Sequence, residues 1–141
     1  MELARRWLPA VVWAGIISTL SSGWFSGERT GALLLPLFAA LFPDSPPEHL
    51  DALHQAVRKL AHFAEYLALS VLLYHALRGP RRWDVRAGVI AAGLAGLYAV
   101  GDEFHQWFVP GRTAAGTDCL IDVSGAAAGQ GILAARARAG R

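Results

Sequence analysis

The sequence predicts an all-α, polytopic membrane bundle of four transmembrane helices, with an additional short interfacial or re-entrant helix after the first of them. Three observations predict this class. The 141 residues are 54% hydrophobic and only 17% charged, against about 25% charged residues in ordinary soluble domains. The apolar residues gather in four runs close to the length, roughly 20 residues, that crosses a bilayer. The arginines form short clusters between these runs, which is typical of membrane proteins and argues against a nucleic-acid partner despite the net charge of +2.

We expect a single domain over residues 1–141 and place its long helices at about 7–25, 46–78, 85–108 and 115–136. The first helix is expected to stay uncleaved, because its apolar run is long and lacks a small-x-small cleavage site. The second helix exceeds the thickness of a bilayer, so its first turns should lie outside the membrane or along its surface.

A shorter apolar stretch, GALLLPLFAALF at residues 31–42, lies between the first two long helices. It is too short to span a bilayer, and we expect Pro36 to break a helix there. This stretch is therefore interpreted as an interfacial or re-entrant piece. The DSPPEHL segment that follows predicts a helix start, with Ser45 as N-cap, Pro46 at the first helical position and Glu48 closing a capping box.

The distribution of arginines predicts the orientation. Arginines precede the first long helix, lie between the second and third, and follow the fourth, so they fall on one side of the membrane. They are Arg5, Arg6, Arg78, Arg81, Arg82, Arg86, Arg136, Arg138 and Arg141. By the positive-inside rule that side is the cytoplasm. We expect a multi-pass protein of the bacterial cytoplasmic (inner) membrane with both termini in the cytoplasm.

Under this topology, polar residues from three separate segments should meet at one depth beneath the outer surface. These residues are Lys59, His62, Glu65, Tyr66, Asp102, Glu103, His105, Gln106, Asp118 and Asp122. Those of the second helix are spaced to share a face, as are three of those in the third. Glu103 is rotated about 100° from Asp102, so whether it faces the same pocket stays open. In the fourth helix both aspartates share a stripe with Gly125 and Gly129, a small-residue surface for close helix packing.

Ionisable groups inside a bilayer cost about a few kcal/mol each, so they pair or line a cavity. Lys59 and Arg112 are the only two cations near this acidic layer, and the excess of carboxylates calls for a metal ion, a shared proton or a cationic ligand. Each part also has a structural interpretation: an intrahelical His62–Glu65 pair, a hydrated helix end, or acids favoured by a helix dipole. The convergence of three polar helix ends favours a functional pocket over these structural interpretations.

Three motifs carry a resemblance to a known family. K-x-x-H-F-x-E-Y at residues 59–66, D-E-x-H-Q-x-x-x-P-G-R at 102–112 and D-x-x-x-D-x-x-G-x-x-x-G at 118–129 together resemble the VanZ-like family of small bacterial membrane proteins. The Ser21-Ser22 pair also fits the signature of that family. The resemblance implies an association with low-level resistance to the glycopeptide antibiotic teicoplanin, but it implies no defined biochemical activity.

The first functional hypothesis is an enzyme that acts on a lipid or lipid-linked cell-envelope substrate by metal-dependent or acid/base hydrolysis or transfer. The expected catalytic residues are His62, Glu65, Asp102, Glu103, His105 and Asp118. The expected substrate-binding residues are Lys59, Tyr66, Gln106, Arg112 and Asp122, with Lys59 and Arg112 holding a phosphate. The hypothetical metal ligands are His62, Glu65, Asp102, His105 and Asp118, a donor set that suits one zinc, manganese or iron ion.

The alternative is a non-catalytic membrane protein in which the same pocket binds a lipid head group, an envelope component or a partner protein. Membrane lipids are expected partners in either case, and a homo-oligomer stays open. A transporter is a third hypothesis, although four helices are few for a transport path.

Overall fold

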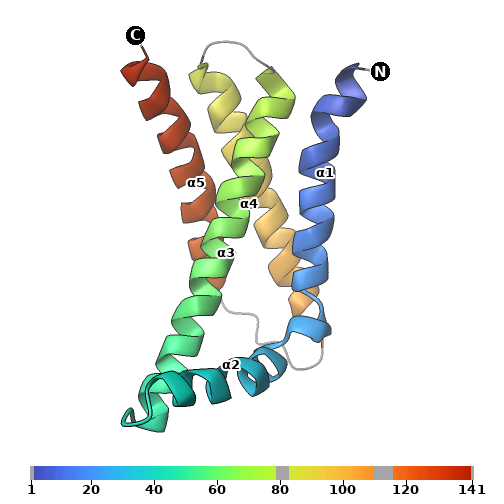
Figure 1. Ribbon diagram of the computed structural model, residues 1–141. Coiled ribbons are helices and arrows are strands. Elements are labelled where there is room, and N and C mark those ends of the chain that lie inside the picture. Colours follow the sequence, from blue (N-terminus) through green and yellow to red (C-terminus); the bar gives the residue numbers. More distant parts are fainter. Residues whose placement is uncertain (1, 79–82, 110–115, 141) are drawn as a thin grey trace.

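The computed structural model describes residues 2–78, 83–109 and 116–140. Within these ranges the chain forms helices and no strand, which confirms the all-α class. The elements are α1 (Glu2–Leu20), a 3-10 turn η1 (Gly23–Phe25), α2 (Gly27–Leu41), α3 (Pro47–Arg78), α4 (Val85–Gln106) and α5 (Gly116–Ala139). Helices α1, α3, α4 and α5 lie side by side as a bundle, and the start of α1 and the end of α5 lie at the same end of it (Figure 1). Helix α2 lies across the opposite end.

The first helix and the short helix after it differ from the sequence prediction. Helix α1 ends at Leu20, and Trp24 and Phe25, expected within it, belong to η1. The segment 21–26, which we call the elbow, turns the chain sharply, and Glu2–Leu20 meets Gly23–Leu41 at an angle of 63°. The hydroxyl of Ser26 then caps α2 by accepting a hydrogen bond of 3.4 Å from the backbone N–H of Arg29.

The expectation that Pro36 breaks the chain here was wrong, because α2 is one continuous helix through Pro36. A proline inside a helix leaves the carbonyl four residues earlier, that of Ala32, without its N–H partner. Both residues are exposed. That carbonyl therefore lies at the surface, where the loss of one backbone hydrogen bond costs less than it does in a core.

Helix α3 begins one residue later than predicted. Pro47 is its first residue, and the carbonyl of Pro46 accepts a bond of 3.4 Å from the backbone N–H of Leu50. Pro46 therefore occupies the cap position that was assigned to Ser45. The helix has 32 residues, a length of about 48 Å at 1.5 Å per residue. It is longer than a bilayer core of about 30 Å, and its first turns lie at the end of the bundle where α2 is found (Figure 1). Whether these turns lie outside the membrane stays a prediction.

The predicted close packing of α5 is confirmed by its glycines. A Cβ atom at Gly125 would overlap the backbone carbonyl of Phe63, and one at Gly129 would lie 2.8 Å from the carbonyl oxygen of Leu67. Helices α3 and α5 therefore touch backbone to backbone along this stripe. The main core lies beside it and is closed by alanines of α4, which let that helix approach closely. Its buried residues are Ile17, Tyr66, Leu69, Ala95, Ala99 and Ala126.

Helices α3 and α4 are each long and apolar enough to cross a membrane. Helix α1 has the required length and hydropathy only when it is taken together with the bent segment 23–41. The described residues thus provide two or three candidate spans, by length and composition. Helix α5 runs the length of the bundle (Figure 1) but is not among these candidate spans, since Asp118, Asp122 and Gln130 lower its hydropathy. The fourth crossing, and the side of the membrane on which each end lies, stay predictions.

Candidate functional site

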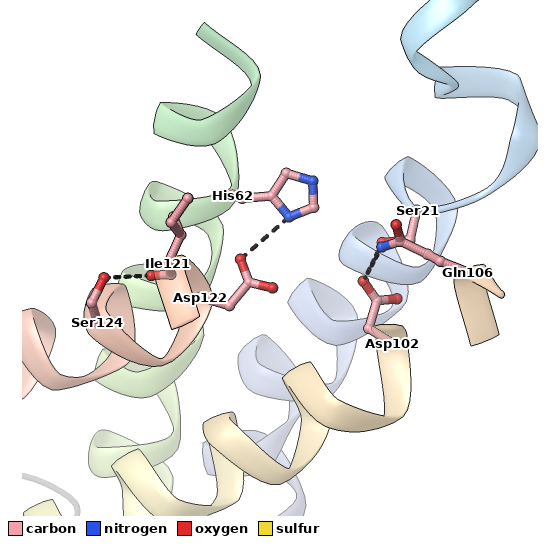
Figure 2. Close-up of polar contacts among 7 residues, drawn as sticks. All are labelled: Ser21, His62, Asp102, Gln106, Ile121, Asp122 and Ser124. Atoms are coloured by element: carbon pink, nitrogen blue, oxygen red, sulfur yellow. Dashed lines mark hydrogen bonds and ion pairs between the residues drawn. The ribbon is translucent and has the colours of Figure 1, made fainter. Parts of the chain in front are cut away.

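The first polar contact of the site joins α3 to α5. Nδ1 of His62 lies 3.3 Å from Oδ1 of Asp122, and the Asp122 side chain is 1% exposed (Figure 2). The carboxylate approaches one ring nitrogen, so Nε2, the other, points away from Asp122. An imidazole oriented by a carboxylate in this way is the arrangement that positions a general acid or base.

The second contact joins the elbow to α4. The hydroxyl of Ser21 donates a hydrogen bond of 2.5 Å to Oδ2 of Asp102, and the amide of Gln106 donates one of 2.9 Å to the same oxygen (Figure 2). All three side chains are buried. Asp102 and Gln106 therefore share a face as predicted. Ser21 is a functional candidate that the sequence marked only through the Ser21-Ser22 pair.

Tyr66 lies close to both contacts. Its side chain is fully buried, and its hydroxyl has no hydrogen-bond partner within the described part of the chain. Asp102 and Asp122 are both near enough to interact electrostatically with this hydroxyl. Its ring packs at a tilt against Tyr98, with 6.4 Å between the ring centroids. The carboxylates of both contacts thus act electrostatically on one buried phenol.

Two small hollows share His62 and Arg58. The first, which we call the polar cavity, has a volume of about 70 Å³ and is lined by Gln55, Arg58, Lys59, His62 and Asp118. The second, the apolar cavity, has a volume of about 190 Å³. Its lining consists of Leu20, Ser21, Phe25, Thr30, Leu34, Val57, Arg58, Ala61, His62 and Glu65. The structure therefore places Lys59, His62, Glu65 and Asp118 of the predicted set around adjoining spaces.

Arg58 is a candidate that the sequence analysis missed. It lies one helical turn before His62, at the spacing that puts two side chains on the same face. Its guanidinium group packs on Gly27 at the start of α2, where a Cβ atom would overlap it. The i, i+4 spacing was the available signal, but the contact with α2 is tertiary and leaves no local trace.

The remaining predicted residues lie elsewhere. His105 is exposed and lines a larger hollow of about 1010 Å³ beside the elbow, which we call the elbow groove. The lining of that groove is Ser22, Gly23, Trp24, Ser26, Glu28, Arg29, Ala32, His105 and Val109. Glu103 lines a separate hollow together with Phe104, Trp107, Gly116 and Cys119. Arg112 lies outside the described residues.

The five residues expected to hold a metal ion are divided among these spaces. Within residues 2–78, 83–109 and 116–140, no three His, Cys, Asp or Glu side chains are grouped closely enough to hold one. His62 and Asp118 share the polar cavity, whereas His105 lies in the elbow groove. The donor set therefore does not fit one shared ion in this arrangement, and the metal site stays a prediction.

Taken together, long apolar helices that enclose buried carboxylates define a membrane-type helical bundle with a polar end. The family model described as VanZ/LLP1 matches residues 7–136. The chain therefore belongs to the VanZ/LLP1 family, which confirms the resemblance inferred from the three motifs. Neither the curated proteins nor the solved structures gave a match.

Proposed function

We propose that this VanZ/LLP1 family protein binds an anionic membrane amphiphile, with a phosphate group in the polar cavity and the adjoining part of the hydrocarbon chain in the apolar cavity. The observation that carries this proposal is that Arg58 and His62 line both spaces. A ligand that filled both cavities would pass these two side chains at the boundary between its head group and its chain.

The composition of the polar cavity favours an anion. Arg58 and Lys59 stand against one carboxylate in its lining, that of Asp118. A guanidinium group binds two oxygens of a phosphate at once, and an ammonium group adds a point charge. The volume of this cavity is about 70 Å³, much smaller than that of the apolar cavity. A single phosphate-sized group fits this space better than a larger head group does.

The apolar cavity favours an amphiphile over free phosphate. Its walls include Phe25, Leu34 and Val57 at the contact between α2 and α3. Each methylene of a ligand buried there contributes about 0.8 kcal/mol. A few carbons next to the head group would therefore raise the affinity well above that of inorganic phosphate. Phospholipids and lipid-linked envelope precursors both have this chemistry, and altered handling of either is our proposed route to the teicoplanin association that the family resemblance implies.

The proposal is tested by native mass spectrometry of the purified full chain in a sugar-free amine-oxide detergent. Phosphatidic acid is the probe, and diacylglycerol, which lacks the phosphate, is the paired neutral lipid. We expect phosphatidic acid to bind in preference, and Arg58→Gln to weaken that binding by about tenfold, as the loss of a charge-assisted contact predicts. Arg86→Gln is the matched control, because Arg86 is exposed at the opposite end of the bundle. Equal binding of both lipids, or an equal loss in the two variants, would rule the proposal out.

A second candidate function is hydrolysis of the bound phosphate ester, and the His62–Asp122 contact favours it. Because Nδ1 faces Asp122, the opposite ring nitrogen is the one available to a ligand in the cavities that His62 lines. In this scheme the imidazole accepts a proton from the attacking water as the new P–O bond forms, and returns it to the leaving alcohol as the ester bond breaks. The products are inorganic phosphate and the free alcohol.

Release of inorganic phosphate from phosphatidic acid tests this second function. We expect release by the unmodified protein, and its loss in Asp122→Asn while phosphatidic acid still binds. That outcome separates an acid/base role from a role in binding alone. Binding without turnover in the unmodified protein would leave the non-catalytic function as the answer.

A further inference from the structure

The elbow groove is distinct from the two cavities of the proposed phosphate site. Successive residues of the elbow and α2 line opposite sides of this segment: Phe25, Thr30 and Leu34 face the apolar cavity, whereas Trp24 and Arg29 face the elbow groove. His105 reaches the groove from the end of α4. The groove is therefore a second space at the same end of the bundle, separated from the first by the chain itself.

The charges around the elbow groove point to a neutral ligand. Glu28 and Arg29 are adjacent and both line it, so one acid is matched by one base. The polar cavity, by contrast, carries an excess of cations. Ser22 and His105 add a hydroxyl group and an imidazole to the lining of the groove. The groove thus has donors and acceptors of several kinds without a strong net charge.

Trp24 supplies an aromatic face in this setting. It is 75% exposed, and the guanidinium carbon of Arg29 lies 5.0 Å from the centroid of its ring. The cation covers one face of the indole and holds the ring in place. The opposite face is the one that a ligand can reach.

We propose that the elbow groove binds a neutral saccharide, with a sugar ring against Trp24 and its hydroxyls bonded to Glu28 and His105. A pyranose ring has apolar C–H faces and a rim of hydroxyls, so it needs an aromatic surface together with mixed donors and acceptors. The groove combines these, and its volume of about 1010 Å³ is at the upper end of the range of ligand pockets. This site does not depend on the phosphate site.

Saturation-transfer NMR on the full chain in the amine-oxide detergent tests the proposal with two neutral probes. Cellobiose is the soluble disaccharide, and a glucosyl diacylglycerol presents the sugar on a lipid, compared with diacylglycerol itself. We expect cellobiose to bind, and Trp24→Ala to reduce its affinity by roughly fivefold or more, as the loss of an aromatic contact predicts. Tighter binding of the glucosyl lipid than of both cellobiose and diacylglycerol would identify the source of the sugar as a glycolipid, and equal affinity of cellobiose would identify a free glycan.

Trp107→Ala is the matched control, because Trp107 is 73% exposed and lines a different hollow. Glu28→Gln is the second variant, since it keeps the size of the side chain at an exposed position and removes the charge that accepts hydrogen bonds. A loss of affinity in Trp24→Ala and Glu28→Gln, with Trp107→Ala unchanged, supports the proposal. The absence of disaccharide binding, or equal effects of both tryptophan substitutions, overturns it, whatever the result with phosphatidic acid.

Discussion

Substitution of Gly125 by alanine tests whether the contact between α3 and α5 holds the site together. The added methyl group would overlap the carbonyl group of Phe63, and both sides of this contact are backbone, so no side chain can move aside. At Gly129 the same change places a Cβ atom 2.8 Å from the carbonyl oxygen of Leu67, where ordinary contact begins at 3.4 Å, so α5 would have to retreat by about 0.6 Å. The shift required at Gly125 is larger.

Overpacking of this kind costs about 1–3 kcal/mol, whereas glycine to alanine in an open helix position gains up to about 1 kcal/mol. Gly131 is the matched control, because it lies on the same helix and a Cβ atom there has no neighbour within 4 Å. Each kcal/mol corresponds to a shift of roughly 3–5 °C in Tm for a domain of this size. We expect Gly125→Ala to melt several degrees below the unmodified protein and Gly131→Ala to melt at the same temperature or above it.

The assay is thermal unfolding in detergent followed by circular dichroism, with phosphatidic acid binding measured on the same samples at a temperature at which both variants are folded. We expect Gly125→Ala to weaken binding as well, because α5 contributes Asp118 to the lining of the polar cavity, and moving α5 away from α3 changes the shape of that cavity. A Gly125→Ala variant as stable as Gly131→Ala would refute the reasoning, since it would mean that the two helices do not meet at this point.

Three further outcomes follow from the polar contacts. Ser21→Ala removes a buried hydrogen bond to Asp102 and should cost about 1.5–3 kcal/mol of stability, whereas Ser124→Ala, whose exposed hydroxyl bonds only to its own helix, should leave Tm nearly unchanged; equal shifts would count against the importance of the buried bond. Tyr66→Phe removes a hydroxyl that has no partner among the described residues, so stability should hold or rise by up to about 1 kcal/mol, and a clear loss would reveal a bridging water. Binding of phosphatidic acid should survive an excess of EDTA, because Arg58 and Lys59 rather than a metal ion hold the phosphate in our proposal. Loss of binding with EDTA, restored by zinc, manganese or iron, would instead favour a site for a divalent metal ion.

The arrangement of the bundle was largely predictable because it follows from hydrophobic runs and small-residue spacing. The boundaries of α3, α4 and α5 lie within a few residues of the predicted ones. The elbow was not predicted, because Trp24 and Phe25 continue the apolar run of α1 in composition, although Ser22-Gly23 is a dipeptide that favours a turn. The continuity of α2 through Pro36 was missed for a related reason. Whether the carbonyl of Ala32 lies in a core or at a surface depends on tertiary position.

The site was predicted in part. Asp102 and Gln106 meet as the helical spacing indicates, but His105 lies in another space. At about 100° per residue, position 105 is rotated some 60° to one side of Asp102 and position 106 some 40° to the other. Only the side that carries Gln106 is buried, where Ser21 of the elbow bonds to Asp102. The sequence of α4 alone does not specify which side this is. The pairing of His62 with Asp122 depends in the same way on where α5 settles on α3.

The glycine stripe of α5 has a consequence for how the site keeps its alignment. Carbonyl groups of Phe63 and Leu67, one turn apart, sit against glycines that are also one turn apart. Sliding α5 by a single turn, about 5.4 Å, would leave one of these carbonyls against a residue that has a side chain. The two glycines therefore fix the axial position of α5 on α3. His62 and Asp122 lie next to this contact along their helices, so the depth at which the imidazole meets the carboxylate is set by two residues that have no side chains at all.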